Sequence, residues 1–467
     1  MSIISDAMGF LFGPAARRPA VDSRLKIHIG GVPIPQRMEG RHFSLSGATG
    51  AGKTVAIRAL LRTIRARADN AVVVDAGGEL MSEFGRPDDL ILSPLDGRSV
   101  RWDPVRELAS PADSQRVALA LIPDIGPDGG SGAEWSAYAR TLVAACLAVA
   151  RDLDELADLL FSVPSYSDVK AGTTGLDEIL ADTPAAQFFA PGAARMTASI
   201  RAIVGSRLQW LPFASAVTGA PWTARRWAAS LDGAERKKQG RIVWIPVRAD
   251  HAQMLAPYVA AVLQQMIVQT LSLAPSPARN IWFFVDEFGS YPRIADLPQI
   301  LTQGRKFGGR VVLGYQSVAQ LESRYGRPGS QSILSCIGTH LVLRQGDPQS
   351  AEWASQLLGK REVIRHTASS SIHGTTDSEQ IRDEPVVHPA DLARLPDLVG
   401  YLRVPGDYPV ARVRLPIPPR SGGEMPANIP APWLAKVRSA PAKDGAPITG
   451  TDAPSGPTSF FGDGAEK

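Results

Sequence analysis

Cysteine and long apolar runs are both scarce in this chain of 467 residues. Its two cysteines, Cys146 and Cys336, are too few for a disulfide framework or a zinc site, so we expect a reducing compartment. A membrane-spanning helix needs about 20 consecutive apolar residues. The longest uncharged apolar run, residues 142–150, has nine, and three glutamines interrupt residues 254–274. The sequence therefore predicts a protein without transmembrane helices.

A strong excess of one charge is also missing, since the net charge is only +4. A hydrophobic content of 44% and a charged content of 21% are typical of a globular protein. Arg58, Arg62 and Arg65 are spaced to share the polar face of one helix. Of the two interpretations of these arginines, a face in solvent and a contact with nucleic acid, we favour the first.

The most informative motif matches the phosphate-loop pattern G-x-x-x-x-G-K-[ST]. It consists of Gly47, Ala48, Thr49, Gly50, Ala51, Gly52, Lys53 and Thr54. In such a loop, backbone N–H groups surround an anionic phosphate, and glycines permit the close approach. Lys53 would add a positive charge and Thr54 a Mg²⁺ ligand, so the motif predicts binding of ATP and Mg²⁺.

The segments that flank the motif fit a phosphate loop better than a flexible glycine-rich turn. Residues 42–46 are typical of a short strand entering the loop, and residues 55–67 have apolar positions at helical spacing. Further apolar runs predict buried strands, mostly in a parallel sheet, and two later segments predict a closing antiparallel pair. The buried runs are residues 71–75, 90–92, 242–247, 281–285, 310–314 and 340–343, and the pair is 401–404 with 410–414.

The order of these patterns predicts four regions along the chain. An N-terminal arm covers residues 1–24, and the nucleotide-binding α/β domain covers residues 25–107 and 227–420. Residues 108–226 show only helical patterns and predict an inserted all-α domain, with tryptophans such as Trp210 as packing anchors. Residues 421–467 are rich in Pro and Gly and predict a disordered tail.

An acidic pair, Asp286 and Glu287, follows directly after the strand predicted at residues 281–285. A phosphate loop needs a carboxylate on a neighbouring strand to hold Mg²⁺ and a second group to orient water. We expect Asp286 to be the metal ligand and Glu287 to be the general base. The alternative is an acidic strand end that simply faces solvent.

Two more polar residues are candidates for contact with the γ-phosphate. Gln316 follows the strand at residues 310–315, so its amide should lie at the carboxyl edge of the sheet and act as a sensor. Arg305 is a candidate arginine finger, a group that stabilises charge in the transition state. Arg344 competes with Arg305 for this role.

In this order, the motifs resemble the coupling ATPases of conjugative type IV secretion, the TraD-like branch of the FtsK/HerA superfamily. The resemblance extends over residues 25–415 and also includes the stretches 74–79, 94–98 and 102–104. It implies a RecA-like P-loop NTPase fold with a mostly parallel central sheet and an inserted all-α domain. Arg305 and Gln316 match the family's positions for a catalytic arginine and a DNA-linked sensor.

The resemblance also implies partners and a location. These are DNA, relaxase and relaxosome proteins, and a homohexameric ring that hydrolyses ATP between subunits and delivers DNA to a secretion channel. Relatives usually carry two transmembrane helices before the phosphate loop, and none is visible here. We therefore expect a cytoplasmic protein, or one attached peripherally to the inner membrane through a membrane-anchored secretion subunit.

Two other functions stay open at this point. One is a HerA-like DNA helicase or translocase that works without a relaxase. The other is a receptor whose helical domain and tail bind protein cargo, with nucleotide as a conformational switch. Both alternatives include the same nucleotide site. They differ in whether nucleotide powers movement along DNA or switches the binding of protein cargo.

Overall fold

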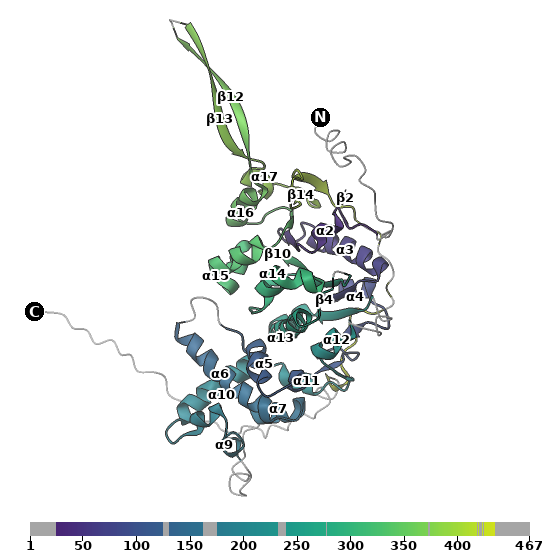
Figure 1. The fold of residues 1–467 in the computed structure, drawn as a ribbon, viewed down its shortest axis with the longest axis vertical. Helices are drawn as coiled ribbons and strands as arrows, with labels where there is room; N and C mark the ends of the chain where they lie inside the picture. The colour runs from purple at the N-terminus through teal and green to yellow at the C-terminus, as the bar shows by residue number, and fades with distance from the viewer. Residues whose placement is uncertain are drawn as a thin grey trace, which may run out of the picture.

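The computed structural model describes residues 25–124, 130–161, 175–231, 240–276, 278–371 and 374–417, together with 419, 423 and 425–434. The predicted N-terminal arm and most of the predicted tail lie outside these residues. In the described part, a central sheet carries helices on both faces, the helical region lies at one end, and a long hairpin projects from the other (Figure 1).

The central sheet has nine strands within the described residues, in the order β15-β14-β11-β3-β10-β9-β4-β8-β5. The pairs from β11 to β5 are parallel, and β14 and β15 are antiparallel. The strands are β3 (Phe43–Ser46), β4 (Asn70–Ala76), β5 (Leu90–Ile91), β8 (Ile242–Val247), β9 (Ile281–Val285), β10 (Gly309–Tyr315), β11 (Thr339–Val342), β14 (Val399–Arg403) and β15 (Ala411–Arg414). The predicted mostly parallel α/β sheet, with its closing antiparallel pair, is confirmed.

Alternation along the strands divides the core between the two faces of the sheet. Ala71 and Val73 pack with the helices α3 (Lys53–Arg67) and α4 (Glu79–Phe84). Val72 and Val74 point to the opposite face and join the cluster of α13 (Ala252–Leu271), α14 (Leu297–Phe307) and α15 (Val318–Ser335). Because both faces are covered, the strands are continuously apolar, as a buried parallel sheet requires.

Smaller elements border this sheet. The Gly30-Gly31 turn joins β1 (His28–Ile29) to β2 (Val32–Pro33), and α2 (Gln36–Glu39) leads into β3. Helices α16 (Pro348–Leu358) and α17 (Pro389–Ala393) pack together beside β14.

The helical region begins and ends at a short parallel pair, β6 (Arg101–Trp102) with β7 (Pro221–Trp222). Its described helices are α5 (Asp113–Leu121), α6 (Gly130–Val149), α7 (Leu153–Phe161), α9 (Leu176–Ile179), α10 (Ala194–Arg207) and α11 (Leu211–Ser215), and α12 (Ala224–Ser230) leads back to the sheet. The Trp102 and Trp210 rings both lie against Tyr258 of α13, with centroids 5.6 and 5.1 Å away. The expected helices are therefore present, whereas the exact domain limits stay a prediction.

Within the described residues, one segment is long and apolar enough to cross a membrane, at Ala249–Leu271, which contains α13. Of the most apolar 18-residue stretch in this segment, 72% is buried inside the protein. Gln265, one of its polar interruptions, is partly satisfied, because its Oε1 accepts from Arg116 Nη1 at 2.6 Å while its buried Nε2 has no partner among the described residues. Burial of this kind is that of a core helix.

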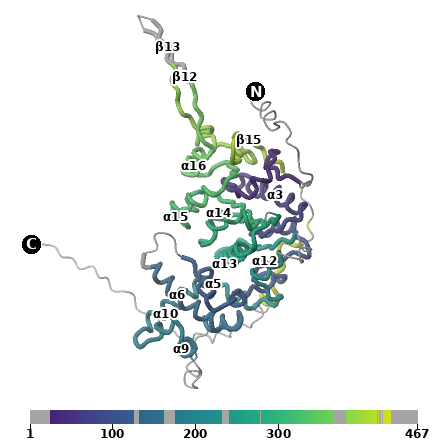
Figure 2. Tube along the Cα trace, viewed as in Figure 1, coloured from purple at the N-terminus to yellow at the C-terminus, as the bar shows by residue number. Residues whose placement is uncertain are grey.

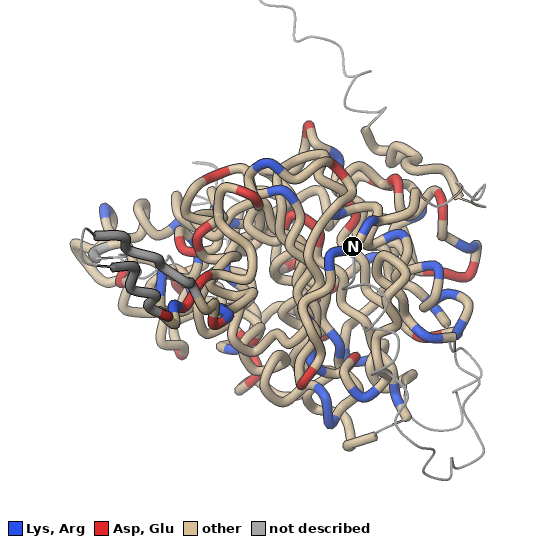
Figure 3. Tube along the Cα trace, turned by 90° about the horizontal axis from the view of Figure 1, so that it is seen from above, with Lys and Arg blue, Asp and Glu red and all other residues tan. Residues whose placement is uncertain are grey.

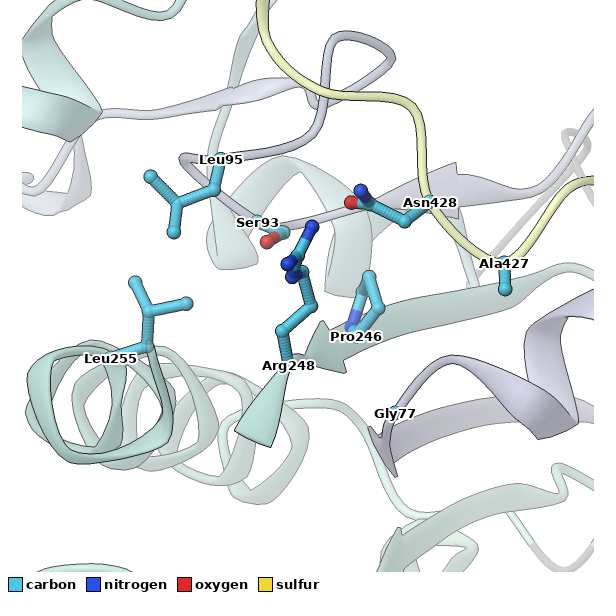
Figure 4. Close-up of a pocket in the computed structure, with 8 residues that line it drawn as sticks. All are labelled: Gly77, Ser93, Leu95, Pro246, Arg248, Leu255, Ala427 and Asn428. Atoms are coloured by element: carbon cyan, nitrogen blue, oxygen red, sulfur yellow. The ribbon is translucent and has the colours of Figure 1, made fainter. Parts of the chain in front are cut away.

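The C-terminal segment 425–434 packs on the body, so the packed part of the chain extends beyond the predicted boundary at residue 421 (Figure 2). Gly97 N donates to Ile429 O at 2.7 Å, and Ala431 N donates to Leu95 O at 3.0 Å. The Trp433 ring stacks on Phe213 of α11 at 5.4 Å. This segment covers one small pocket, lined by Gly77, Ser93, Leu95, Pro246, Arg248, Leu255, Ala427 and Asn428 (Figure 4).

The sequence did not predict the projecting hairpin, formed by β12 (Lys360–Ser371) and β13 (Gly374–Pro385). Its strands pair only with each other within the described residues. Near its base, Ile364 and Ile381 lie opposite each other and are 56% and 68% exposed. These two apolar side chains are therefore exposed where a buried strand would cover them.

Candidate nucleotide site

The phosphate loop connects β3 to α3 as the sequence predicted. Gly47 N donates to Tyr315 O at 3.2 Å and Ala48 N donates to Arg344 O at 2.7 Å, so the loop is fixed to the ends of both neighbouring strands. Gly52 has a φ of 119°, and a Cβ there would lie 2.9 Å from Leu398 Cδ2. Glycine is therefore required at this position both for conformation and for space.

Lys53 begins α3 and folds back over the loop. Its Nζ donates to Gly47 O at 2.8 Å and to Ala48 O at 3.4 Å, and it lies 3.9 Å from Glu287 Oε1. The side chain is only 6% exposed. Because the first N–H groups of a helix have no acceptor within the helix, the start of α3 adds partial positive charge at the same place.

Asp286 lies at the end of β9 and faces the loop from two strands away. Its Oδ2 accepts from Thr54 Oγ1 at 3.3 Å, so the two expected metal ligands are neighbours. Burial, and next the adjacent Glu287 charge, raise the pKa of Asp286. A buried carboxylate and a hydroxyl are hard oxygen donors of the kind Mg²⁺ prefers, and a cation there would offset the cost of burying the charge. The residues therefore fit the predicted ion.

Glu287 is the next residue and has a left-handed backbone, with a φ of 53°. This conformation is uncommon for a residue other than glycine and occurs mostly where the surroundings impose it. The Glu287 side chain is 28% exposed, so water can reach it, and its Oε2 accepts from Gln316 Nε2 at 2.8 Å.

Gln316 joins the Glu287 carboxylate to the phosphate loop. While its Nε2 donates to Glu287, its Oε1 accepts from Thr49 Oγ1 at 3.1 Å. This position follows from topology, because β10 lies between β3 and β9 and Gln316 comes directly after β10. The structure thus brings Thr49, Lys53, Glu287 and Gln316 together at one edge of the sheet.

Sequence reasoning missed Asp75, which ends β4 beside Asp286. In register, Val74 pairs with Val285, so the two aspartates follow at equivalent positions. Asp75 Oδ2 accepts from Met81 N at 2.7 Å near the start of α4. Burial raises the pKa of Asp75 to about 7, and the Asp286 charge adds to the shift. The signal was present in the sequence, since Asp75 is also a carboxylate directly after a buried apolar run.

Arg305 does not lie at this site. It stands in the last turn of α14, ahead of β10, and seven residues of strand separate that end from Gln316. At about 3.3 Å per residue, this is roughly 20 Å. A Cβ on Gly40 would lie 2.9 Å from Arg305 Cγ, which places Arg305 beside the entry to β3, at the amino edge of the sheet. Its side chain is exposed.

The competing arginine, Arg344, lies next to the loop but is already engaged. Its carbonyl accepts from Ala48 N, and its Nη2 lies 2.9 Å from Asp397 Oδ1. Within one subunit, neither arginine therefore presents a free guanidinium to the phosphate loop.

The arginines on α3 do not form a solvent-facing surface, so that interpretation was wrong. Arg58 Nη2 lies 2.7 Å from Glu79 Oε2 on α4, and Arg65 is buried against Asp89. Arg62 Nη2 donates to Pro419 O at 2.9 Å. Their charges fasten α3 to its neighbours, and elsewhere positive and negative residues are mixed over the surface (Figure 3).

Three features define an α/β protein of the P-loop NTPase class: a phosphate loop before α3, an acidic pair after β9, and Gln316 after the intervening strand β10. Residues 26–416 match the family model described as the type IV secretion-system coupling protein DNA-binding domain. The chain therefore belongs to the type IV secretion-system coupling protein family.

Individual relatives agree with this assignment. The chain is 30% identical over 403 residues to the coupling protein TraD of Escherichia coli strain K12. That alignment covers 83% of this chain and 54% of TraD, so the chain spans about half the length of this curated relative.

Solved structures of the bacterial conjugative coupling protein TrwB are also similar. The unbound form, TrwBdeltaN70, superposes with a TM-score of 0.76 at 32% identity, covering 88% of this chain and 92% of that one. TrwB in complex with ADP and Mg²⁺ gives 0.75 at 31% identity, covering 88% and 93%. TrwB with the ATP analogue ADPNP gives the same values.

Proposed function

We propose that this chain is an ATP-hydrolysing coupling protein that binds DNA and uses ATP to move it. The observation that carries the proposal is the continuous set of contacts from Thr49 through Gln316 to Glu287 and Lys53. Phosphate binding, water activation and sensing are thereby joined in one site. Similarity to TraD and to nucleotide-bound TrwB supports the same choice over a HerA-like helicase or a cargo receptor.

Each residue has a role that follows from its place. The loop amides and Lys53 bind the phosphates, Thr54 and Asp286 hold Mg²⁺, and Glu287 accepts a proton from the attacking water. When bound, Mg²⁺ supplies charge stabilisation at the phosphate oxygens. Gln316 fixes Glu287 and changes partner when the γ-phosphate is lost.

The proposed assembly rests on the position of Arg305, which lies far from the phosphate loop of its own subunit. Arg305 is exposed at the amino edge, far from its own loop, so it can act as an arginine finger only in the site of a neighbouring subunit. This supports a ring, and we propose a homohexamer. As further parts of the proposal, relaxase proteins bring the DNA, and the protein works in the cytoplasm, at the inner membrane beside a membrane-anchored secretion subunit.

The test is phosphate release from Mg²⁺-ATP by the full chain, with and without DNA. We expect hydrolysis that rises with DNA and disappears in Lys53→Ala. Lys26→Ala is the matched control, because it removes the same charge from an exposed position and should leave the rate unchanged. A rate that is indifferent to DNA, or that survives Lys53→Ala, would contradict the proposal.

A further inference from the structure

Three arginines gather where α15 packs against the segment that follows Glu287. Arg324 and Arg327 are exposed on α15, and Arg293 is half-buried after the short 3-10 helix η5 (Phe288–Ser290). The two elements are in contact, because Arg324 Nε donates to Gly289 O at 3.5 Å. The Arg293 charge acts on the Tyr325 hydroxyl, which places it at the same junction.

These guanidinium groups differ from those of Arg58 and Arg98, which have carboxylate partners. Among the described residues, no carboxylate forms an ion pair within 4.0 Å of any of the three. Glu322, an acidic residue nearby on α15, instead accepts from Gln349 at 2.8 Å. A group of unpaired arginines offers forked donors to an anionic chain such as a phosphate backbone.

Resting on the proposed function, we propose that Arg324 and Arg327, supported by Arg293, bind backbone phosphates of DNA, and that this contact is transmitted to Glu287. The ligand is a polyanion read without sequence preference, because guanidinium–phosphate contacts carry no base information. Helix α15 thus couples DNA binding to ATP hydrolysis.

Direct contacts connect α15 to the segment that follows Glu287. The Tyr325 ring packs on Phe288, with centroids 5.5 Å apart, and the Tyr325 hydroxyl accepts from Ile294 N at 3.0 Å. A Cβ on Gly289 would lie only 2.9 Å from Gln320 Cβ, so α15 and this segment touch without spare room. Movement of α15 must therefore move the segment that begins directly after Glu287.

A joint in α15 lies at the same place. Gly326 has a φ of 71° and a ψ of 163°, which interrupts the helix between Tyr325 and Arg327. Left-handed φ is available to glycine without steric cost. The two exposed arginines therefore stand on opposite sides of a break in the helix, next to the tyrosine that contacts Phe288.

The first experiment replaces both exposed arginines, as Arg324→Gln with Arg327→Gln, in the full chain. Binding of a labelled single strand and of its duplex is measured over a salt series, together with ATP hydrolysis. We expect affinity to fall about 10-fold or more and the salt slope to drop by about 2, since each phosphate contact contributes about 0.9. DNA stimulation should fall, whereas the rate without DNA should not change.

Two matched variants keep this result interpretable. Arg86→Gln with Arg195→Gln removes the same charge from exposed arginines elsewhere and should leave binding and its salt slope unchanged. Arg324→Lys with Arg327→Lys keeps the charge and should keep most of the affinity. If the glutamine pair binds DNA as the wild type does, the inference is wrong, and the patch becomes a candidate for an acidic protein partner instead.

The second experiment tests transmission with Tyr325→Phe, which keeps the ring and removes the hydroxyl that holds Ile294. We expect DNA affinity to stay near wild type while stimulation by DNA decreases. Full stimulation in this variant would overturn the transmission step. Both outcomes are separable from failure of the proposed function, which would already show as absent hydrolysis or absent DNA stimulation in the wild-type protein.

Discussion

The two edges of the central sheet use the same residue types in different ways. At the carboxyl edge, Lys53, Asp286 and Glu287 surround a loop of backbone amides, and their charges are only partly matched. At the amino edge, carboxylates are fully engaged, since Asp89 accepts from Arg65, Ile242 N and Trp244 Nε1. Charges that satisfy one another hold the fold, whereas a group with unmatched charge can bind a ligand.

Arg305 contrasts with these paired groups, because it is exposed at the amino edge, as is the adjacent Lys306. Asp69 illustrates the rule there, accepting from Asn280 Nδ2 at 2.8 Å and from Trp282 Nε1 at 3.2 Å. An exposed arginine contributes little to stability. The proposed role of Arg305 in a neighbouring subunit is consistent with this difference, and the predictions below test it.

The largest effect is expected for Arg305→Ala. An arginine finger contributes about 10³–10⁵ in turnover, so hydrolysis by the assembly should fall by at least about 1,000-fold. Nucleotide affinity and the unfolding midpoint should stay near wild type, because the side chain is exposed and distant from its own loop. The measurements are steady-state phosphate release, nucleotide titration and urea denaturation.

A mixing experiment decides whether Arg305 acts between subunits. Arg305→Ala supplies intact loops and Lys53→Ala supplies intact fingers, so assembling the two inactive variants together should restore part of the activity. No recovery in proven mixed assemblies would place the role of Arg305 elsewhere.

A large loss of stability is expected for Arg65→Ala. Removing one partner of a buried ion pair costs about 3–5 kcal/mol, since Asp89 keeps its charge in the interior. Arg65 Nη1 also donates to Gly240 O at 2.6 Å, and this carbonyl would lose its donor. Denaturant unfolding measures the change, and Arg86→Ala is the exposed control. A loss below about 1 kcal/mol would show that the amino edge is not held by this pair.

Gln316→Ala should produce an intermediate effect on hydrolysis. Hydrogen bonds to charged groups contribute about 1.5–3 kcal/mol, which corresponds to roughly 10- to 100-fold in rate if Glu287 loses its orientation. Gln316→Glu is an informative companion, because it keeps the size and replaces the donor with a second carboxylate beside Glu287. A wild-type rate in Gln316→Ala would exclude a role for this bridge.

The smallest effect concerns Asp75 and depends on pH. Its pKa of about 7 in the folded protein exceeds the ordinary aspartate pKa of 3.8, so between these values the folded state binds more protons than the unfolded state. This carboxyl therefore lowers stability as pH rises through that window, by up to about 1.4 kcal/mol per pH unit. Asp75→Asn removes the titration and keeps an acceptor for Met81 N.

The measurement is urea unfolding of both proteins in EDTA, from pH 5 to pH 8. The stability of Asp75→Asn relative to wild type should increase up to about pH 7 and then level off. A difference that is independent of pH would show that Asp75 is ionised throughout.

The sequence predicted what depends on local pattern. The loop, its strand and helix, and the buried strands were found because glycine spacing and continuous apolar runs are local signals. The position of Gln316 at the carboxyl edge was expected, since parallel strands present their carboxyl ends at one edge, whereas its hydrogen bond to Glu287 was not predicted.

What the sequence did not show depends on tertiary structure. The β12–β13 hairpin was missed because its sequence is mostly polar, and burial of Arg65 was missed because Asp89 is distant in sequence from α3. Residues 425–434 contain three prolines and follow a glycine-rich stretch, yet backbone hydrogen bonds to Leu95 and Gly97 hold them in place.

The most direct test of the nucleotide site is Glu287→Gln, with ATP binding and hydrolysis measured on the same preparation. The variant keeps an acceptor for Gln316 but cannot take a proton, so general-base catalysis worth about 10²–10⁴-fold should be lost while Mg²⁺-ATP affinity is preserved. Hydrolysis at the wild-type rate would contradict the assignment of Glu287 as the base and, with it, the account of how this edge of the sheet works.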